Sequence, residues 1–360
     1  MLDENRRQFL SNILQPVAPP REIDKPFTEE QKRRLLDVVH DKGEWKLILA
    51  QHFPNVEALL ATFAGGFPEG FTPTLDMFIT PTFRGFLANY STVLYPEMHD
   101  LFYNEAFLGH AKSYWNAEYA KPQMMLFNIN GPCANSDPGH LDTPSFRGVR
   151  YENSPTWLCS VMGRSGLFSD YLIKMAQVIT WFSHDPNSGF TYWPKGPLAR
   201  PERVKAPIYN RAVVVQNEML VHRGEANGPV ERRRPAGLAF ESVFTGDPGD
   251  RDGWLVKTGD KVIERYRTDE LRFLVHWSAE VFSDFDELKK NMDGSDSLTH
   301  EQAIDTLIKD VRSRGYQIET PTDPLNDPAF IRAINAAYDF GGPAEYPEEA
   351  TVDAPLAAAA

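Results

Sequence analysis

Cysteine is scarce in this chain, which has only Cys133 and Cys159 among its 360 residues. So few thiols exclude a disulfide-rich secreted scaffold and any zinc or iron–sulfur module that needs several cysteines. One disulfide between the two stays open, although two reduced thiols in the cytosol are the simpler interpretation. The N-terminus is acidic and lacks the apolar segment of a secretory signal, so we expect a cytoplasmic protein.

Long apolar runs and an excess of positive charge are also missing. No stretch of about 18 apolar residues occurs, so the sequence predicts no membrane-spanning helix. The 37 Lys and Arg residues face 50 Asp and Glu residues, which gives a formal net charge of −13. Proteins use cationic surfaces to bind the phosphates of nucleic acids or anionic lipids. The charge balance therefore argues against a general nucleic-acid binder and against a polybasic membrane-surface protein.

Helical patterns dominate the first third of the chain. Thr28 is an expected N-cap, because acidic residues and then apolar residues at helical spacing follow it. Similar apolar patterns cover 45–53, 56–63 and 96–119. We therefore predict that residues 1–120 form a helical N-terminal scaffold packed on the rest of the protein.

From Lys121 onward, short apolar or aromatic segments alternate with clusters of turn-forming residues. The 28 prolines and 24 glycines of the chain are consistent with many turns between strands. The predicted strands are 124–129, 157–162, 177–182, 190–193, 211–215, 238–244, 254–257 and 271–277. Many short strands favour an antiparallel sandwich or jelly roll over a parallel sheet. The predicted class is a β-rich α+β fold with its core at 121–280 and flanking helices at both ends.

The last part of the chain returns to helix. Residues 297–314 place apolar side chains on one stripe at helical spacing, with Ser297 or Thr299 as the cap. We assign 281–340 to a C-terminal helical extension. Residues 341–360 are rich in Pro, Glu and Ala, a composition typical of a disordered tail.

The segment with the clearest chemistry follows the predicted strand 124–129. It contains His140 and Asp142, two residues apart. In extended chain, alternate residues project to the same side, so an imidazole and a carboxylate here can converge on one ion. A third ligand is available in His222, at the end of another apolar segment. Two histidines and one carboxylate on one face of a metal leave positions open, an arrangement typical of non-haem Fe(II) oxygenases.

These residues resemble the motif of the Fe(II)/2-oxoglutarate-dependent oxygenase superfamily. The motif is H-x-D, a long gap, a distal His and an Arg about ten residues later. His140-Leu141-Asp142 and His222 match the first two elements, and the run 232–234 of three arginines matches the last. The resemblance covers about 124–277 and implies a double-stranded β-helix, or jelly-roll, core. It also implies Fe(II) as cofactor, with 2-oxoglutarate and O₂ as co-substrates.

The resemblance assigns roles to these residues. His140, Asp142 and His222 would be catalytic and would hold the iron. A guanidinium suits the distal carboxylate of 2-oxoglutarate, because it offers two parallel donors and keeps its proton. Spacing favours Arg233, eleven positions after His222, and Arg234 is the second choice. Since Asp142 is present, halogenation, which relatives without this carboxylate perform, is disfavoured.

Other residues near the motif have both a functional and a structural interpretation. Asn128 or Asn130 could face the cofactor, or could satisfy backbone groups before the Gly-Pro turn. Phe146 and Arg147 could bind substrate, Arg147 by pairing with a carboxylate, although an exposed arginine is equally consistent with the sequence. Trp193 could line the pocket or pack in the core.

The expected activity is oxidation of a small molecule, by hydroxylation, desaturation or ring closure. By analogy with the family, the substrate would be an amino acid or an intermediate of secondary metabolism. Two alternatives stay open. One is a cupin-type metalloenzyme that does not use 2-oxoglutarate, and the other is a non-catalytic jelly-roll binding protein with a vestigial metal motif.

Overall fold

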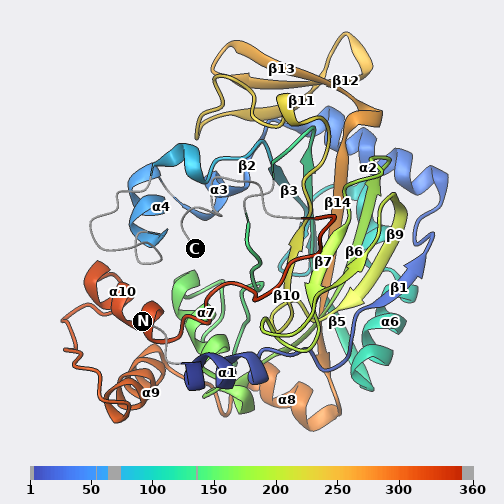
Figure 1. Cartoon of the computed structure of the whole chain (residues 1–360). Coiled ribbons are helices and arrows are strands. Elements are labelled where there is room, and N and C mark those ends of the chain that lie inside the picture. Colours follow the sequence, from blue (N-terminus) through green and yellow to red (C-terminus); the bar gives the residue numbers. More distant parts are fainter. Residues whose placement is uncertain (1–3, 54, 64–73, 135–136, 351–360) are drawn as a thin grey trace.

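The computed structural model describes residues 4–53, 55–63, 74–134 and 137–350, and it has a mixed α+β fold (Figure 1). Within these ranges, eleven strands form one large antiparallel sheet in the order β1-β9-β6-β14-β5-β3-β2-β11-β12-β13, with β4 beside β3. Its strands are β1 (Arg21–Asp24), β2 (Trp45–Leu47), β3 (Phe83–Asn89), β4 (Thr92–Val93), β5 (Tyr119–Asn130), β6 (Lys174–Ser183), β9 (Ile208–Val215), β11 (Val243–Asp247), β12 (Asp250–Thr258), β13 (Lys261–Arg267) and β14 (Arg272–Phe282). A smaller sheet has the order β10-β7-β8 and contains β7 (Phe190–Trp193), β8 (Glu202–Val204) and β10 (Val221–Gly224).

The chain alternates between the two sheets. It leaves β5 in the large sheet, pairs His140 with His222 of β10 beside the small sheet, and returns to β6. It then runs through β7 and β8 of the small sheet, back to β9, across to β10, and finally to β14. Strands far apart in sequence therefore become neighbours, and β14 lies between β5 and β6.

Each face of the large sheet has its own apolar packing. Helices α2 (Glu29–Lys42), α5 (His99–Phe102) and α6 (Glu105–Trp115) cover the outer face, where the Trp277 indole donates to the Phe102 carbonyl at 2.7 Å. The other face packs against the small sheet, with Trp181 of β6 against Phe190 of β7. Because successive side chains of a strand alternate between faces, residues 272, 274, 276 and 278 of β14 face the space between the sheets.

Further helices lie around the two sheets. They are α1 (Glu4–Ile13), α3 (Ile48–His52), α4 (Val56–Phe63), α7 (Thr156–Ser165), α8 (Phe285–Asp293), α9 (His300–Ser313) and α10 (Pro328–Ala337), with 3-10 turns at Leu75–Met77, Pro96–Met98, Ser169–Tyr171, Val230–Arg232 and Thr268–Glu270. Helices α7, α9 and α10 share a second core (Figure 1). Thr299 caps α9 through a reciprocal capping box, as its sequence position predicts. No helix in the described ranges is long and apolar enough to cross a bilayer.

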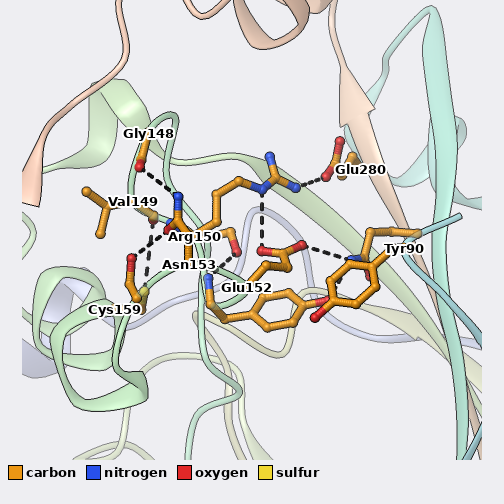
Figure 2. A network of polar contacts seen from close by, with 12 residues as sticks. Tyr90, Gly148, Val149, Arg150, Glu152, Asn153, Cys159 and Glu280 are labelled. Carbon is orange, nitrogen blue, oxygen red and sulfur yellow. Dashed lines mark hydrogen bonds and ion pairs between the residues drawn. The ribbon is translucent and has the colours of Figure 1, made fainter.

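A polar network ties the loop after the H-x-D segment to β14 (Figure 2). Glu280 of β14 has a fully buried side chain and is paired with Arg150 and with Lys121. Arg150 also contacts Glu152 at 3.4 Å. A buried carboxylate is stable only when charged or polar partners satisfy it, so this loop has one defined position on the sheet.

Several predicted elements differ from the observed ones. Residues 157–162, predicted as a strand, belong to helix α7, because Leu158, Val161 and Met162 are buried at helical spacing. The segment 45–53, predicted as helix, begins with strand β2 and continues as α3. Strands β1 to β4 within 1–120 join the large sheet, so this region is not purely helical.

The predicted tail also contacts the core in its described part. The Tyr346 hydroxyl donates to the carbonyl of Pro138 at 2.9 Å, and the Trp193 indole donates to the carbonyl of Glu345 at 3.2 Å. Residues 341–350 therefore lie beside the H-x-D segment, where disorder was expected. Residues 351–360 lie outside the described ranges.

Candidate metal centre

Backbone pairing brings the two predicted histidine ligands together. His140 and His222 form an antiparallel bridge in which each amide donates to the other's carbonyl at 3.0 Å. Two residues on, the Asp142 amide donates to the Asn217 carbonyl at 3.1 Å. The extended H-x-D segment is thus hydrogen-bonded to β10 at His222 and to the residues just before β10 at Asn217. Its alternate side chains point to the same side, as expected for extended backbone.

The side chains of His140, Asp142 and His222 converge. One ligand atom of each lies within 4.8 Å of the others. The Nε2 atoms of His140 and His222 are 3.9 Å and 3.8 Å from Asp142 Oδ1. Side-chain exposure falls from 51% for His140 to 29% for Asp142 and 7% for His222. The cluster is therefore anchored on the buried β10 and open on the side of His140.

Both imidazoles are held through their Nδ1 atoms. His140 Nδ1 is 2.5 Å from Asp137 Oδ2, and His222 Nδ1 is 2.8 Å from the Leu220 carbonyl. A carbonyl oxygen only accepts, so Nδ1 of His222 carries the hydrogen and its Nε2 keeps a lone pair. Such partners fix the ring orientation and tautomer of metal-binding histidines. The same arrangement around His140 leaves its Nε2 directed at Asp142.

The electrostatics favour an ionised carboxylate at the centre. Burial opposes ionisation of Asp142, but His222, His276 and His140 outweigh it and lower the pKa of this carboxyl to about 2. Burial, with the nearby charge of His140, lowers the pKa of His222 to about 4. For His140, burial acts to lower the pKa, but the Asp137 carboxylate outweighs it and raises the pKa to about 9.

One atom of the cluster indicates that an ion belongs there. Asp142 Oδ2 is buried and has no hydrogen-bond partner among the described residues. A buried polar atom without a partner costs about 1–3 kcal/mol, more for a charged group. A cation held by both carboxylate oxygens of Asp142 and by the two Nε2 atoms would satisfy this oxygen. Such an ion would displace the proton that Asp137 keeps on His140. Two imidazoles and one carboxylate are the donor set of open ferrous sites.

Three polar side chains around the cluster were missed by the sequence reasoning. They are Arg84 on β3, His52 on α3 and His276 on β14. The charge of Asp142 acts on all three. No spacing relative to the H-x-D motif points to them, because they come from segments before and long after it. Asn128, predicted beside the cofactor, accepts a hydrogen bond from Arg84 Nε at 2.8 Å.

A buried arginine, Arg272, lies on the side of β10 that carries His222, two residues further along the strand. Arg272, the first residue of β14, is 9% exposed, and its Nη atoms donate to the carbonyls of Glu225 and Gly189 at 3.3 Å and 3.1 Å. Gly224 follows His222 by two residues, so both face the same side of β10. A Cβ atom on Gly224 would lie 2.5 Å from Arg272 Nη1. The guanidinium therefore occupies the space that a side chain at 224 would take.

The arginine run 232–234 has a different environment. Arg232 pairs with Glu264 and Glu270 and lies over the Tyr266 ring at 5.4 Å. Arg233 donates to the Gly228 carbonyl at 3.0 Å, and Arg234 is exposed. These residues lie on a 3-10 turn and the residues that follow it, where expected strand alternation does not apply. Strand alternation therefore does not choose between Arg233 and Arg234, and the prediction from spacing that one of them binds 2-oxoglutarate stays a prediction.

The residues proposed for substrate binding are enclosed by other residues or already paired. Phe146 is 1% exposed and packs against Phe168 in the core shared by α7, α9 and α10. Trp193 is fully buried. A side chain with no accessible surface cannot contact a substrate. Arg147 pairs with Asp296 at 2.8 Å, so its charge is already compensated.

Buried polar groups brace the strands behind the cluster. Glu225 accepts from Arg203 Nε at 2.7 Å, from the Thr191 hydroxyl at 2.7 Å and from the Gly189 amide at 2.9 Å. These bonds join the end of β10 to β7 and β8. Asn130, the other asparagine considered for the cofactor, donates to Asn227 at 3.1 Å and is likewise part of the scaffold.

Comparisons with known proteins found matches among solved structures. No family model matches the chain, and no curated protein matches its sequence. Among solved structures, it is similar to the crystal structure of an oxidoreductase of the 2OG-Fe(II) oxygenase family from Burkholderia pseudomallei. The sequence identity is 9%, the TM-score is 0.30, and the match covers 56% of this chain and 68% of that chain.

Proposed function

We propose that this protein is a mononuclear non-haem Fe(II)- and 2-oxoglutarate-dependent oxygenase that oxidises a small molecule. The observation that carries the proposal is the combination of two features on one face of β10. The His140, Asp142 and His222 cluster offers three ligands, and the buried guanidinium of Arg272 lies beside Gly224, one alternation beyond His222. A metal site with an arginine behind it suits a chelating 2-oxo acid that has a second carboxylate.

The strand order supports the same proposal. A jelly roll, or double-stranded β-helix, is made when the chain alternates between two facing sheets. The segments from β5 to β14 alternate in this way, with β5, β14, β6 and β9 adjacent in one sheet and β10, β7 and β8 in the other. In this proposal the core is a jelly roll, and β1 to β4 and β11 to β13 extend one of its sheets.

The roles of the residues follow from their chemistry. The three ligands would hold iron and leave the exposed side of His140 open to co-substrate and substrate. Asp137 and the Leu220 carbonyl would keep both Nε2 atoms directed at the metal. Arg272 would bind the distal carboxylate of 2-oxoglutarate, because its guanidinium is buried and donates to the neutral carbonyls of Glu225 and Gly189.

When bound, iron, 2-oxoglutarate and O₂ together supply the oxidising power, with release of succinate and CO₂. The protein contributes a site partly shielded from water, and the buried faces of β10 and β14 orient the co-substrate. Oxidation by hydroxylation, desaturation or ring closure is consistent with this site. Asp142 occupies the position that a halogenase leaves to halide, so we do not expect halogenation.

Anaerobic spectroscopy tests the proposal. Fe(II) alone should give no visible band, and adding 2-oxoglutarate should produce a weak metal-to-ligand charge-transfer band. His140→Ala and Asp142→Ala should abolish the band and iron binding. His99→Ala, at an exposed surface position, is the matched control and should leave the band unchanged.

The result also separates the alternatives. If iron binds through the triad but 2-oxoglutarate neither produces a band nor yields succinate in air, the protein is a metalloenzyme of the cupin type that does not use this co-substrate. If Fe(II) does not bind at all, the non-catalytic interpretation replaces the proposal.

A further inference from the structure

Arg84 presents a positive charge to the same space as the metal cluster, from a strand outside those that carry the ligands. In the register of the large sheet, Arg84 pairs with Asn128, and Asn128 pairs with Leu274. One alternation further along β14 is His276. Paired residues and alternate residues share a face of a sheet, so Arg84, Asn128 and His276 all lie on one face. Leu274 packs between the two sheets, and β10 of the small sheet carries His222, so this is the face of the metal cluster.

The hydrogen-bond partners of Arg84 are neutral. Its Nε donates to Asn128 Oδ1 at 2.8 Å, and its Nη1 lies 2.9 Å from His52 Nε2. Burial, together with the charge of Arg84, lowers the pKa of His52 to about 4, so this ring is uncharged near neutral pH and accepts from the guanidinium. Within the described residues, Arg84 forms no ion pair with a carboxylate. Its charge is held in place and not compensated.

Asp142 does not compensate the charge of Arg84 in the iron-bound protein. It is the acidic group whose charge acts on Arg84, but in the proposed function it is a ligand to iron. A bound ferrous ion would take up the negative charge of Asp142 and add positive charge to the space. A half-buried guanidinium beside a cationic centre is unfavourable unless an anion joins it.

The two arginines of this space, Arg272 and Arg84, differ in access. Arg272 is 9% exposed and lies behind Gly224, whereas Arg84 is half-buried. A co-substrate that binds first can occupy the deeper position, and a substrate that binds later and is then released needs the more accessible one. This difference assigns 2-oxoglutarate to Arg272 and leaves Arg84 for the substrate.

We propose that Arg84, oriented by Asn128 and His52, binds a carboxylate of the substrate, so that the enzyme oxidises a small organic acid. This inference rests on the proposed function and names its substrate class. A single guanidinium supplies one positive charge and a planar pair of donors, which matches a monoanionic carboxylate better than a dianionic phosphate ester.

The test uses the full chain loaded anaerobically with Fe(II) and 2-oxoglutarate. The probes are free L-amino acids and simple aliphatic and aromatic monocarboxylic acids, each compared with its primary amide, and a set of phosphate monoesters. Binding is followed by calorimetry and by perturbation of the visible band. We expect at least one acid to bind at least about tenfold more tightly than its amide, and Arg84→Gln to remove that preference.

Three variants make the result specific. Arg84→Gln should keep the Fe(II)–2-oxoglutarate band, because Arg84 binds neither the iron nor 2-oxoglutarate in this proposal. Arg84→Lys should restore part of the preference for acids, since it keeps the charge without the fork. Arg147→Gln removes an arginine that is paired with Asp296, and it should leave the preference unchanged. Circular dichroism of each variant checks that it is folded.

Several outcomes overturn the proposal. The proposal is wrong if none of the acids binds to wild type more tightly than to Arg84→Gln. It is also wrong if phosphate monoesters bind more tightly than the acids. If Arg84→Gln weakens 2-oxoglutarate itself, Arg84 is the co-substrate anchor, and the oxygenase function stands without this substrate assignment. Failure of wild type to form the band would instead refute the proposed function.

Discussion

The surface turn at 230–234 and the interior face of β14 both carry arginines that follow His222 in the chain, but their environments are opposite. On the turn, Arg232 has two acidic partners, Glu264 and Glu270. In the interior, Arg272 has neutral carbonyls as its hydrogen-bond partners and is 9% exposed. A paired, solvated charge has little left to offer a ligand, whereas a buried charge without an ion pair gains most from one. In the proposed function, burial and pairing, more than spacing from His222, therefore distinguish the arginine that binds 2-oxoglutarate.

The largest expected effect compares the two regions directly. Arg272→Ala should weaken 2-oxoglutarate binding by about 30-fold or more, on the order of 2–5 kcal/mol, because the distal carboxylate would lose its buried partner. Arg233→Ala should leave it unchanged. Titration of the anaerobic visible band measures both. The opposite order, with Arg233→Ala the damaging change, would return the anchor to the surface turn.

Next in size is the carboxylate behind the exposed ligand. Asp137→Asn should lower iron affinity by about 10–100-fold, because its one amide oxygen cannot accept from both His140 and the Gly139 amide, and the charged acceptor that orients the His140 ring is lost. Competition with a chromophoric chelator measures the change. The melting temperature of the metal-free protein reports any general loss of structure. Equal iron affinity in the variant and wild type would mean that backbone pairing alone positions His140.

A smaller effect should follow from filling the space beside the interior arginine. Gly224→Ala would place a methyl group 2.5 Å from Arg272 Nη1, so the guanidinium must move. We expect 2-oxoglutarate binding to weaken roughly tenfold, with iron binding intact. Gly109→Ala, on α6 with nothing within 4 Å of the added Cβ, is the matched control. Unchanged co-substrate affinity in Gly224→Ala would argue that Arg272 does not touch it.

The buried carboxyl of Glu218 should make the stability of the protein depend on pH. Burial, with the nearby Asp142 charge, raises the pKa of Glu218 to about 8, and its carboxyl accepts a hydrogen bond from Gln177. The folded protein thus binds a proton that the unfolded chain releases near its ordinary pKa of 4.5. Stability from this group is fully present below that pH and is lost as the pH rises towards 8.

Glu218→Gln should therefore become progressively more stable than wild type as the pH rises from about 5 to 8. Urea unfolding of the metal-free proteins at several pH values measures the difference in free energy. Glu231→Gln, an exposed residue of the surface turn, is the control for the same chemical change. A difference for Glu218→Gln that does not vary with pH would show that its carboxyl is ionised in the folded protein.

The smallest effect belongs to the paired surface arginine. Arg232→Ala removes two ion pairs that are about one-third exposed, and it should cost about 0–1 kcal/mol of stability. It should not affect iron or 2-oxoglutarate. The free energy of unfolding, measured at low and at high salt, reports this contribution, which should shrink as salt increases.

Local patterns in the sequence predicted the features that depend on neighbouring residues. The cluster of His140, Asp142 and His222 was predicted from two local features, which are the two-residue spacing of the first pair and the apolar segment that leads to His222. The cap at Thr299 and the helix that follows it were also predictable, because capping involves residues three apart. Short strands separated by turns indicated the antiparallel sheet.

Local patterns gave wrong predictions where contacts between residues distant in sequence decide the type of element or the burial of a side chain. Residues 157–162 are apolar enough for a strand, but they bury one helical stripe against α9 and α10. Phe146 is aromatic and close to the motif in sequence, and Trp193 is an aromatic residue of a predicted strand, yet both are enclosed by core residues. Periodicity over so few residues does not separate a buried helix from a strand, and it does not tell which side of a strand faces a cavity.

By itself, therefore, the sequence determined the composition of the candidate ligand set, since the residue types and the extended spacing of the H-x-D segment are typical of ferrous sites. Tertiary structure alone decided which arginines lie near that set. The strands β11 to β13 lie between His222 and Arg272 in the chain, and Arg84 comes from a strand added at the other side of β5. Their side chains reach the site only because sheet order and register, set by non-local pairing, bring them to one face.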